Sequence, residues 1–417
     1  MKVWLIREGE ALPVMENVRL MRMGMLAQYL SEQGHQVTWW ASTYIHGKKE
    51  YYCEEYRELK VNDHLELILL HSPISYKKNV SVSRLCYNAR LSREFVSHSK
   101  KEEVPDIILC SWPTPDFARE AVRYGKRHHV PVILDARDCW PDIFYRPFPK
   151  QVQWFVKLCL LPMKYSAYRT FKQADGITGM SQESLRWGCH YAGREPGRND
   201  KCIYIGNYRI DRTPEKYATA VQQWAQLGVT TETWNICFIS TMGRHLDLET
   251  LILAVKELVQ QGLKIKLIIG GDGDMKAYYQ HVADDTEYII FAGWLDGNQM
   301  NSLMQLSKCG AYSLRNTEDF IDTFSNKAIQ YLAAGLPVLN SLKGFARTFL
   351  YENQMGLTYM EGDVKDCAEK IRSLYFDEIL RSQMSQNAVE KFEDMFEASK
   401  VNKEFEEYLL SFVKECY

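Results

Sequence analysis

The chain has 417 residues, too many for one hydrophobic core, and the usual size of roughly 100–200 residues per domain predicts two or three domains. Hydrophobic residues make up 46% and charged residues 25%, which excludes an intrinsically disordered chain. Because 51 basic residues nearly balance 53 acidic ones, no global positive field exists to hold nucleic acid, and we expect no nucleic-acid partner.

The cellular compartment is predicted from the absence of a signal peptide, a membrane helix and cysteine motifs in this sequence. Charges stand in the first ten residues, where a secretory signal needs an apolar stretch of about 7–15 residues. No uncharged apolar run approaches the roughly 18 residues of a membrane helix. The 11 cysteines include no Cys-x-x-Cys pair, which argues against a zinc ribbon or a disulfide framework. We expect a cytoplasmic protein.

Short β-like runs alternate with segments of helical period in two series along the chain. The first series predicts a helix over Asn17–Gln33, ended by Gly34, and strands at residues 2–6, 36–40, 65–70, 106–110, 132–135 and 176–180. The second series predicts a helix whose apolar stripe runs over 248–259 and which Gly262 ends, and strands at residues 235–241, 264–269, 288–292, 311–314 and 337–339.

This alternation predicts an α/β protein with two doubly wound, Rossmann-like domains of parallel strands, facing each other across a cleft. We expect the domains at residues 1–207 and 208–393, with a C-terminal helix in 394–417 that packs back on the first domain. The polar stretch 208–231 is the expected boundary. Ligands of such domains bind at the carboxyl ends of the strands.

The most informative stretch is residues 322–338. Ser325 is the expected N-cap of a helix, and Lys327 would lie in its first turn. Free backbone N–H groups, the helix dipole and a lysine together favour a bound phosphate. The alternative interpretation is a capped surface helix with incidental charge. Gly335 and Pro337 end the helix in either case.

The same stretch resembles the signature of family 4 retaining glycosyltransferases, enzymes of GT-B fold. The usual signature is Glu-x7-Glu followed by Ala-x-Ala-x-Gly-x-Pro-Val. Asp322 and Gln330 stand at the two acidic positions, and Ala333, Gly335, Pro337 and Val338 match the tail. Within the family, the chain looks most like bacterial O-antigen and capsule transferases. Weaker motifs follow in the expected order over nearly the whole chain, at residues 133–141, 179–181, 204–211, 242–244, 269–273 and 291–294.

The resemblance implies a role for each matching residue. Asp322 would contact the donor sugar and Gln330 the ribose, although Gln330 supplies no charge. The other donor-binding residues would be Gly243, Arg244, Gly271, Ser325, Asn326 and Lys327. In the first domain, Arg137 and Asp138 would take part in catalysis by orienting the donor sugar or the acceptor, and Glu8 and Gly9 would line the acceptor side.

The implied reaction moves a hexosyl or N-acetylhexosaminyl group from a nucleotide-diphosphate sugar, UDP-linked, to a glycan or polyprenyl-diphosphate-linked acceptor in surface polysaccharide synthesis. Charge on the leaving diphosphate would be stabilised by a helix amino end and basic side chains, without a metal or another cofactor. Two alternatives stay open: a sugar-nucleotide epimerase of the same fold, and a non-catalytic partner in polysaccharide assembly.

Two further segments each allow two interpretations. Asp272-Gly-Asp274 spells a metal-binding Asp-x-Asp of other glycosyltransferases, but after a predicted strand we interpret it as a turn and expect no metal site. Residues 144–172 hold six basic residues, no acidic ones and many aromatic and leucine side chains. This composition is typical of a segment that binds an anionic membrane surface, here the inner face of the plasma membrane. It equally suits a core helix with a solvated basic face.

Overall fold

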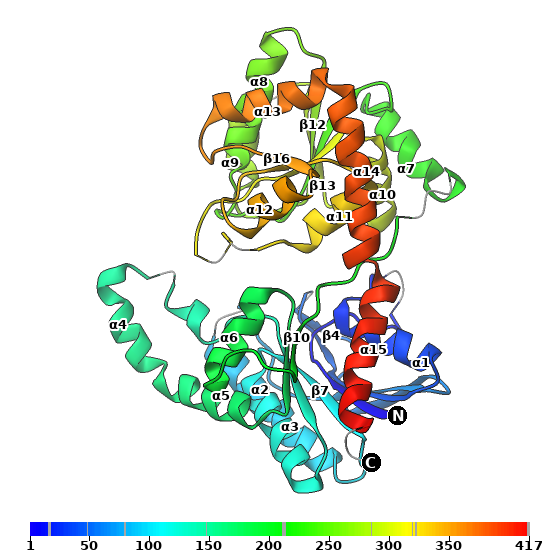
Figure 1. Cartoon of the computed structure of the whole chain (residues 1–417), viewed down its shortest axis with the longest axis vertical. Coiled ribbons are helices and arrows are strands. Elements are labelled where there is room, and N and C mark those ends of the chain that lie inside the picture. The colour runs from blue at the N-terminus through cyan, green and yellow to red at the C-terminus, as the bar shows by residue number, and fades with distance from the viewer. Residues whose placement is uncertain are drawn as a thin grey trace. The chain divides into compact units, whose positions relative to one another are not determined.

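The structure is a computed structural model that describes residues 1–15, 18–47, 49–78, 81–146, 148–210, 214–284, 286–318, 320–321 and 323–414. It divides into two compact units, each with its own sheet (Figure 1). The first unit contains residues 1–206 and 399–417, and the second contains residues 207–398. The chain therefore leaves the first unit, builds the second and returns.

The first unit is built on an eight-stranded sheet in the order β10-β9-β8-β7-β1-β2-β6-β5. All neighbouring strands are parallel except β5, which runs antiparallel to β6 at one edge. The strands are β1 (Lys2–Ile6), β2 (Gln36–Ser42), β5 (Arg57–Asn62), β6 (Leu65–Leu70), β7 (Ile107–Trp112), β8 (Val132–Ala136), β9 (Gly176–Gly179) and β10 (Asp200–Cys202). A short hairpin, β3 (Tyr44–Ile45) with β4 (Glu50–Tyr51), follows β2.

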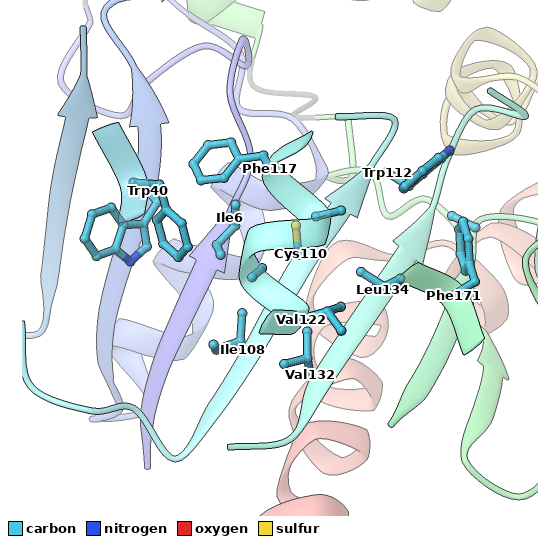
Figure 2. Packing of buried hydrophobic residues seen from close by; sticks show 14 of the residues in the cluster. Ile6, Trp40, Ile108, Cys110, Trp112, Phe117, Val122, Val132, Leu134 and Phe171 are labelled. Atoms are coloured by element: carbon cyan, nitrogen blue, oxygen red, sulfur yellow. The ribbon is translucent and has the colours of Figure 1, made fainter. Parts of the chain in front are cut away.

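Successive side chains of the central strand β1 enter opposite cores, as the period of two in a strand requires. Trp4 and Ile6 belong to one buried cluster, and Val3 and Leu5 to the other. Figure 2 shows the first cluster between the sheet and its covering helices. The helices on that face are α2 (Val82–His98), α3 (Pro115–His128), α5 (Leu161–Gln173) and α6 (Gln182–Ala192). The opposite face is covered by α1 (Arg22–Glu32) and by α15 (Ala398–Lys414) from the far end of the chain.

The second unit holds a six-stranded parallel sheet in the order β13-β12-β11-β14-β15-β16. Its strands are β11 (Trp234–Ile239), β12 (Ile265–Gly270), β13 (Ile289–Gly293), β14 (Cys309–Tyr312), β15 (Val338–Asn340) and β16 (Gly356–Thr358). Its helices are α7 (Pro214–Gln226), α8 (Leu248–Gln260), α9 (Lys276–Ala283), α10 (Gly297–Leu306), α11 (Asn326–Ala334), α12 (Phe345–Glu352), α13 (Val364–Phe376) and α14 (Glu378–Met395). The predicted α/β architecture with doubly wound parallel sheets is confirmed.

The structure corrects two predicted elements. The helix expected from Asn17 begins at Arg22, because Met21 has extended backbone and the buried carboxylate of Glu10 accepts a hydrogen bond from the Met23 N–H at 3.1 Å; Asn17 itself lies outside the described residues. The strand expected at 311–314 ends at Tyr312, because Leu314 turns away to form an isolated antiparallel bridge with Leu246.

Candidate functional site

The second unit has its topological switch point between β11 and β14. The chain builds outward from β11 through β12 to β13, and then crosses to the other side at β14. Neighbouring loops diverge at such a point and leave a crevice at the carboxyl ends of the strands. The loops after β11 and β14 are joined there by hydrogen bonds from Asp247 N to Ser313 O at 3.1 Å and from Arg315 N to His245 O at 2.9 Å. This edge therefore carries a braced framework for a ligand site.

The helix α11 begins at this edge. Ser325 is its N-cap, as predicted, and the Ser325 hydroxyl accepts a hydrogen bond from the Lys327 N–H at 3.3 Å. The Ser325 N–H donates to the hydroxyl of Tyr312, the last residue of β14, at 3.1 Å. Strand and helix start are thereby tied together, and the positive end of the helix dipole lies at the switch point.

Two amide side chains of α11 lack hydrogen-bond partners within the described ranges. The Asn326 side-chain oxygen is buried and unpartnered. Gln330, one helical turn further on, is 9% exposed, and its amide makes no hydrogen bond to any described residue. Buried amides normally find partners, so two such groups on the first turns of one helix indicate a ligand-facing surface. Asp322, the first residue of the signature, lies outside the described residues.

Arg244 and Lys327 differ in their surroundings. Arg244 is exposed on the loop after β11 and forms no ion pair with the residues that the structure describes. The ammonium of Lys327 lies 3.3 Å from the Met300 sulfur of α10. The Arg244 guanidinium is thus available to bind an anion, whereas the Lys327 ammonium already contacts the Met300 sulfur.

Gly271 allows the loops after β11 and β12 to approach closely. Its φ is 124°, and a Cβ built there would lie 2.0 Å from the Ser240 carbonyl oxygen. Any side chain would push the backbone of Ser240, which follows β11, away. We therefore assign Gly271 a role in shaping the site. Gly243 has a similar restriction, because a Cβ there would lie 2.7 Å from the His245 ring.

Asp272 follows β12 in an exposed turn that leads into α9. Its carboxylate pairs with Lys276 at 2.9 Å and accepts the Gly273 N–H at 2.8 Å. The hydrogen bond to Lys276 holds the pKa of Asp272 below its ordinary value. Within the described ranges, no three His, Cys, Asp or Glu side chains gather as a metal-binding group.

The first unit has its own switch point, between β1 and β7. Glu8 and Gly9 lie in the loop after β1, as predicted; Glu8 is buried and forms no hydrogen bond with the described residues. Arg137, at the end of β8, forms a largely buried ion pair with Glu10 of the same loop. Burial works against charge on Arg137, but Glu10 and Asp135 outweigh it and raise its pKa. Arg137 is therefore engaged in bracing the loop, whereas Asp138 is exposed beside it.

A buried ion pair behind this loop was not predicted. Arg22 donates two hydrogen bonds of 3.0 Å to Asp135, which also accepts one from Thr178 at 2.8 Å. Burial raises the pKa of Asp135, but Arg22, Arg137 and Thr178 outweigh that effect and hold it below its ordinary value. The sequence signal that could have revealed this pair is Arg22 itself, which stands on the apolar stripe of α1, where a buried charge needs a partner.

The segment 144–172 forms α4 (Lys150–Cys159) and α5. None of the side chains of α4 is buried, so the interpretation as a core helix is wrong there and holds only for Ala167, Thr170 and Phe171 of α5. In Figure 1, α4 lies at the margin of its unit, beyond α5. Lys164 pairs with Asp142 at 2.9 Å, so the segment has one basic group fewer than its composition indicated. Across the part of the chain that the structure describes, no helix has the length and apolarity needed to span a bilayer.

Comparison with known proteins agrees with this geometry. Residues 222–391 match the family described as Glycosyl transferases group 1. The Staphylococcus aureus capsular polysaccharide biosynthesis glycosyltransferase CapM is 24% identical over 185 residues, which are 43% of this chain and 47% of that protein. The match thus spans about half the length of this curated relative.

Two solved structures resemble nearly the whole chain. Sucrose-phosphate synthase from Thermosynechococcus elongatus has a TM-score of 0.69 at 14% identity, with 97% of each chain covered. Anabaena Alr3699/HepE, solved with UDP and glucose, has a TM-score of 0.64 at 16% identity, with 99% of this chain and 100% of that one covered. The chain therefore has a GT-B fold, and residues 222–391 of its second unit match the glycosyltransferase group 1 family.

Proposed function

We propose that the protein is a retaining glycosyltransferase of family 4 that uses a nucleotide-diphosphate sugar, UDP-linked, as donor. The observation that carries the proposal is the switch point of the second unit. There the amino end of α11, the exposed Arg244 and the unpartnered amides of Asn326 and Gln330 belong to the segment that matches the glycosyltransferase family. HepE, one of the structural neighbours, was solved with UDP, which supports the choice of base.

The chemistry requires stabilisation of negative charge on the leaving diphosphate as the glycosidic bond breaks. The α11 dipole would supply it without reorganisation, because the start of the helix is fixed before the substrate binds, and Arg244 would add a positive charge. Gln330 would bind the ribose, using its carbonyl as acceptor and its NH2 as donor. Asp322 would contact the donor sugar, as the resemblance implies. Asp138 is our candidate for orienting the sugar or the acceptor, and Arg137 would act by holding the loop of Glu8 and Gly9 in place.

The reaction is proposed to need no metal or other cofactor. Asp272 supports this, because its carboxylate is already paired with Lys276 in a turn. Activity should therefore survive EDTA. Complete loss of activity on chelation, restored by manganese or magnesium, would contradict the proposal.

The transferred group is proposed to be a hexosyl or N-acetylhexosaminyl group, and the acceptor a glycan or polyprenyl-diphosphate-linked glycan of surface polysaccharide synthesis. The capsular relative supports this assignment. Purified protein should be incubated with a panel of sugar nucleotides, with and without glycan acceptors, and the products separated by mass spectrometry and NMR. A transferase consumes donor in an acceptor-dependent way and retains the anomeric configuration. Conversion of donor alone would indicate an epimerase, and no conversion of any donor would favour a non-catalytic partner.

We also propose that the protein works in the cytoplasm, on the inner face of the plasma membrane, which it contacts through α4. In a helix of 3.6 residues per turn, Trp154, Phe155 and Leu158 share one side, with Lys150 and Lys157 along its edge. Exposed apolar side chains beside basic groups suit the interface of an anionic bilayer. A lipid-linked acceptor would be held at the same surface.

A further inference from the structure

A cluster of cations surrounds one buried tyrosine in the first unit. The ammonium of Lys49 lies 4.9 Å from the centre of the Tyr76 ring, and the Arg84 guanidinium lies 5.5 Å from it. Arg84 also lies 4.5 Å from the ring of Trp140. The His46 Nδ1 is 2.6 Å from the Tyr76 hydroxyl and 3.2 Å from the Lys49 ammonium. Tyr76 and Trp140 are buried, whereas the three basic side chains are partly exposed above them.

The cluster stands at the ligand-binding edge of the sheet. His46 follows the β2–β3 segment and Tyr76 follows β6, so both lie beyond the carboxyl ends of neighbouring parallel strands. It also touches the loop after β1: a Cβ built on Gly9 would lie 2.9 Å from the His46 Cβ. Gly9 is a residue that we assign to the acceptor side. The cations are therefore placed next to that side of the site.

The basic groups of the cluster affect one another's protonation. Burial and the charges of Lys49, Arg84 and Arg7 lower the pKa of His46 to about 4, and burial together with Arg84 lowers the pKa of Lys49. Glu8 is the carboxylate whose field reaches Tyr76. Glu10, the next acid on that loop, is engaged by Arg137 and Arg7. The described basic groups thus lower one another's pKa values, and a bound anion would offset this mutual repulsion.

The backbone of Lys49 adds an independent observation. Lys49 has a φ of 59°, in the left-handed region that a lysine rarely occupies, and its N–H is bonded to Ile45 O at 2.8 Å. Glycine adopts this conformation without strain. A strained lysine that places its ammonium over Tyr76 is more readily explained by a task for the side chain than by the turn itself.

We propose that Lys49, Arg84 and His46 form a phosphate-binding subsite that holds a phosphate or diphosphate group of the acceptor. Glu8 would then lie beside the subsite, where its carboxylate can accept a hydrogen bond from an acceptor hydroxyl. The assignment rests on the proposed transfer reaction only in naming the ligand as the acceptor. The binding of phosphate itself does not depend on that reaction and is tested without it.

The test follows the His46 ring by NMR in the full chain labelled at histidine, with its signal identified from the His46→Gln variant. Inorganic phosphate and pyrophosphate are titrated at constant ionic strength near pH 7, and glucuronate is titrated separately. We expect saturable shifts of the His46 signal with the phosphates and weaker binding of glucuronate, whose single carboxylate carries less charge. The loss of one charged hydrogen bond should weaken phosphate binding about tenfold or more.

The variants are chosen so that folding does not obscure the result. Lys49→Gly removes the ammonium and relieves the left-handed backbone, so its melting temperature should equal or exceed that of the wild type. Arg84→Gln removes the second charge and keeps most of the stem. Lys327→Ala, in the other unit, is the matched control and should leave the phosphate response of His46 unchanged.

Three results would overturn the assignment. The first is a His46 signal that millimolar phosphate does not shift, and the second is a shift in Lys49→Gly and Arg84→Gln as large as that in the wild type. The third is a shift caused by glucuronate but not by phosphate. If phosphate binds as expected but no sugar nucleotide is consumed with any acceptor, the transfer reaction fails and the subsite stands. If transfer occurs but phosphate does not shift the His46 signal, the subsite is ruled out and the transfer reaction stands.

Discussion

Replacing Trp154, Phe155 and Leu158 of α4 by serine should release the protein from anionic membranes without destabilising its fold. These side chains are 67%, 56% and 54% exposed, and no side chain of α4 is buried, so folding gains little from them. Full burial of a large apolar side chain contributes about 1.5–3 kcal/mol. Scaled by the exposed fractions, the three contribute about 3–5 kcal/mol in a membrane interface, or more than 100-fold in partitioning.

Flotation with liposomes of defined anionic lipid content measures the partitioning, and thermal unfolding measures stability. The matched control replaces Tyr351, Phe376 and Ile379 by serine; these second-unit side chains are at least as exposed as those of α4, and the control should float as the wild type does. Charge reversal of Lys150 and Lys157 should weaken binding further, most strongly at low salt, since each basic group near an anionic surface contributes about 1 kcal/mol that salt screens. Lys164 is left intact because it pairs with Asp142. Equal flotation of wild type and triple variant, or a melting temperature several degrees lower, would refute this reasoning.

Three further predictions concern the two switch points. Arg244→Ala should weaken nucleotide-sugar binding about 10- to 150-fold, the effect of one charged hydrogen bond, and more than Lys327→Ala does; calorimetry with UDP-sugars checks this, and unchanged affinity in both would exclude the diphosphate role. Gln330→Glu should hold or tighten donor affinity, because a carboxylate, which is usual at this position of the signature, can accept hydrogen bonds from the ribose hydroxyls with both oxygens; a tenfold loss at unchanged melting temperature would contradict the ribose role. Asp135→Asn should cost about 3–5 kcal/mol at pH 7 by leaving Arg22 buried and unpaired. Because the pKa of Asp135 is lowered in the folded state, its contribution to the free energy of unfolding is present above pH 4 and is lost as pH falls further. Denaturant titrations should therefore show the free energies of unfolding of variant and wild type converging in acid.

Most of the first sheet could be predicted because its strands are buried on both faces. Segments such as Leu65–Leu70 are therefore apolar at every position except Glu66. The edge strand β5 alternates exposed with half-buried side chains in Arg57–Asn62, and its charged sequence resembles that of a loop. The short strands β10 and β16 have three residues each, too few for a period to appear. The prediction thus failed at an edge strand with one-sided burial and at two of the short strands, whereas the equally short β15 was predicted because it is wholly buried.

The candidate site could be predicted where a residue has a local task. Ser325 caps a helix and Gly335 ends it in left-handed conformation, and both tasks are visible within a few residues of sequence. The pairing of Arg22 with Asp135 joins positions 113 residues apart. The convergence of His46, Tyr76 and Arg84 depends in the same way on the order of strands in the sheet. Only the topology brings such groups together, so a single sequence carries no spacing that reveals them.

The second unit begins and ends at one place in space. Asn207 N donates to Phe396 O at 2.8 Å, and Ala398 N donates to Asn207 O at 2.9 Å, so its first and last residues are hydrogen-bonded neighbours. The whole unit is in this sense an insertion, and the gene segment for residues 207–398 could be excised and expressed alone. Shortening the gene from its 3′ end would instead remove α15 from the first unit and leave the second unit intact. Loss of α15 would uncover apolar surface on the sheet formed by the first half of the chain, so truncated products should aggregate through their amino-terminal half while the inserted unit stays folded.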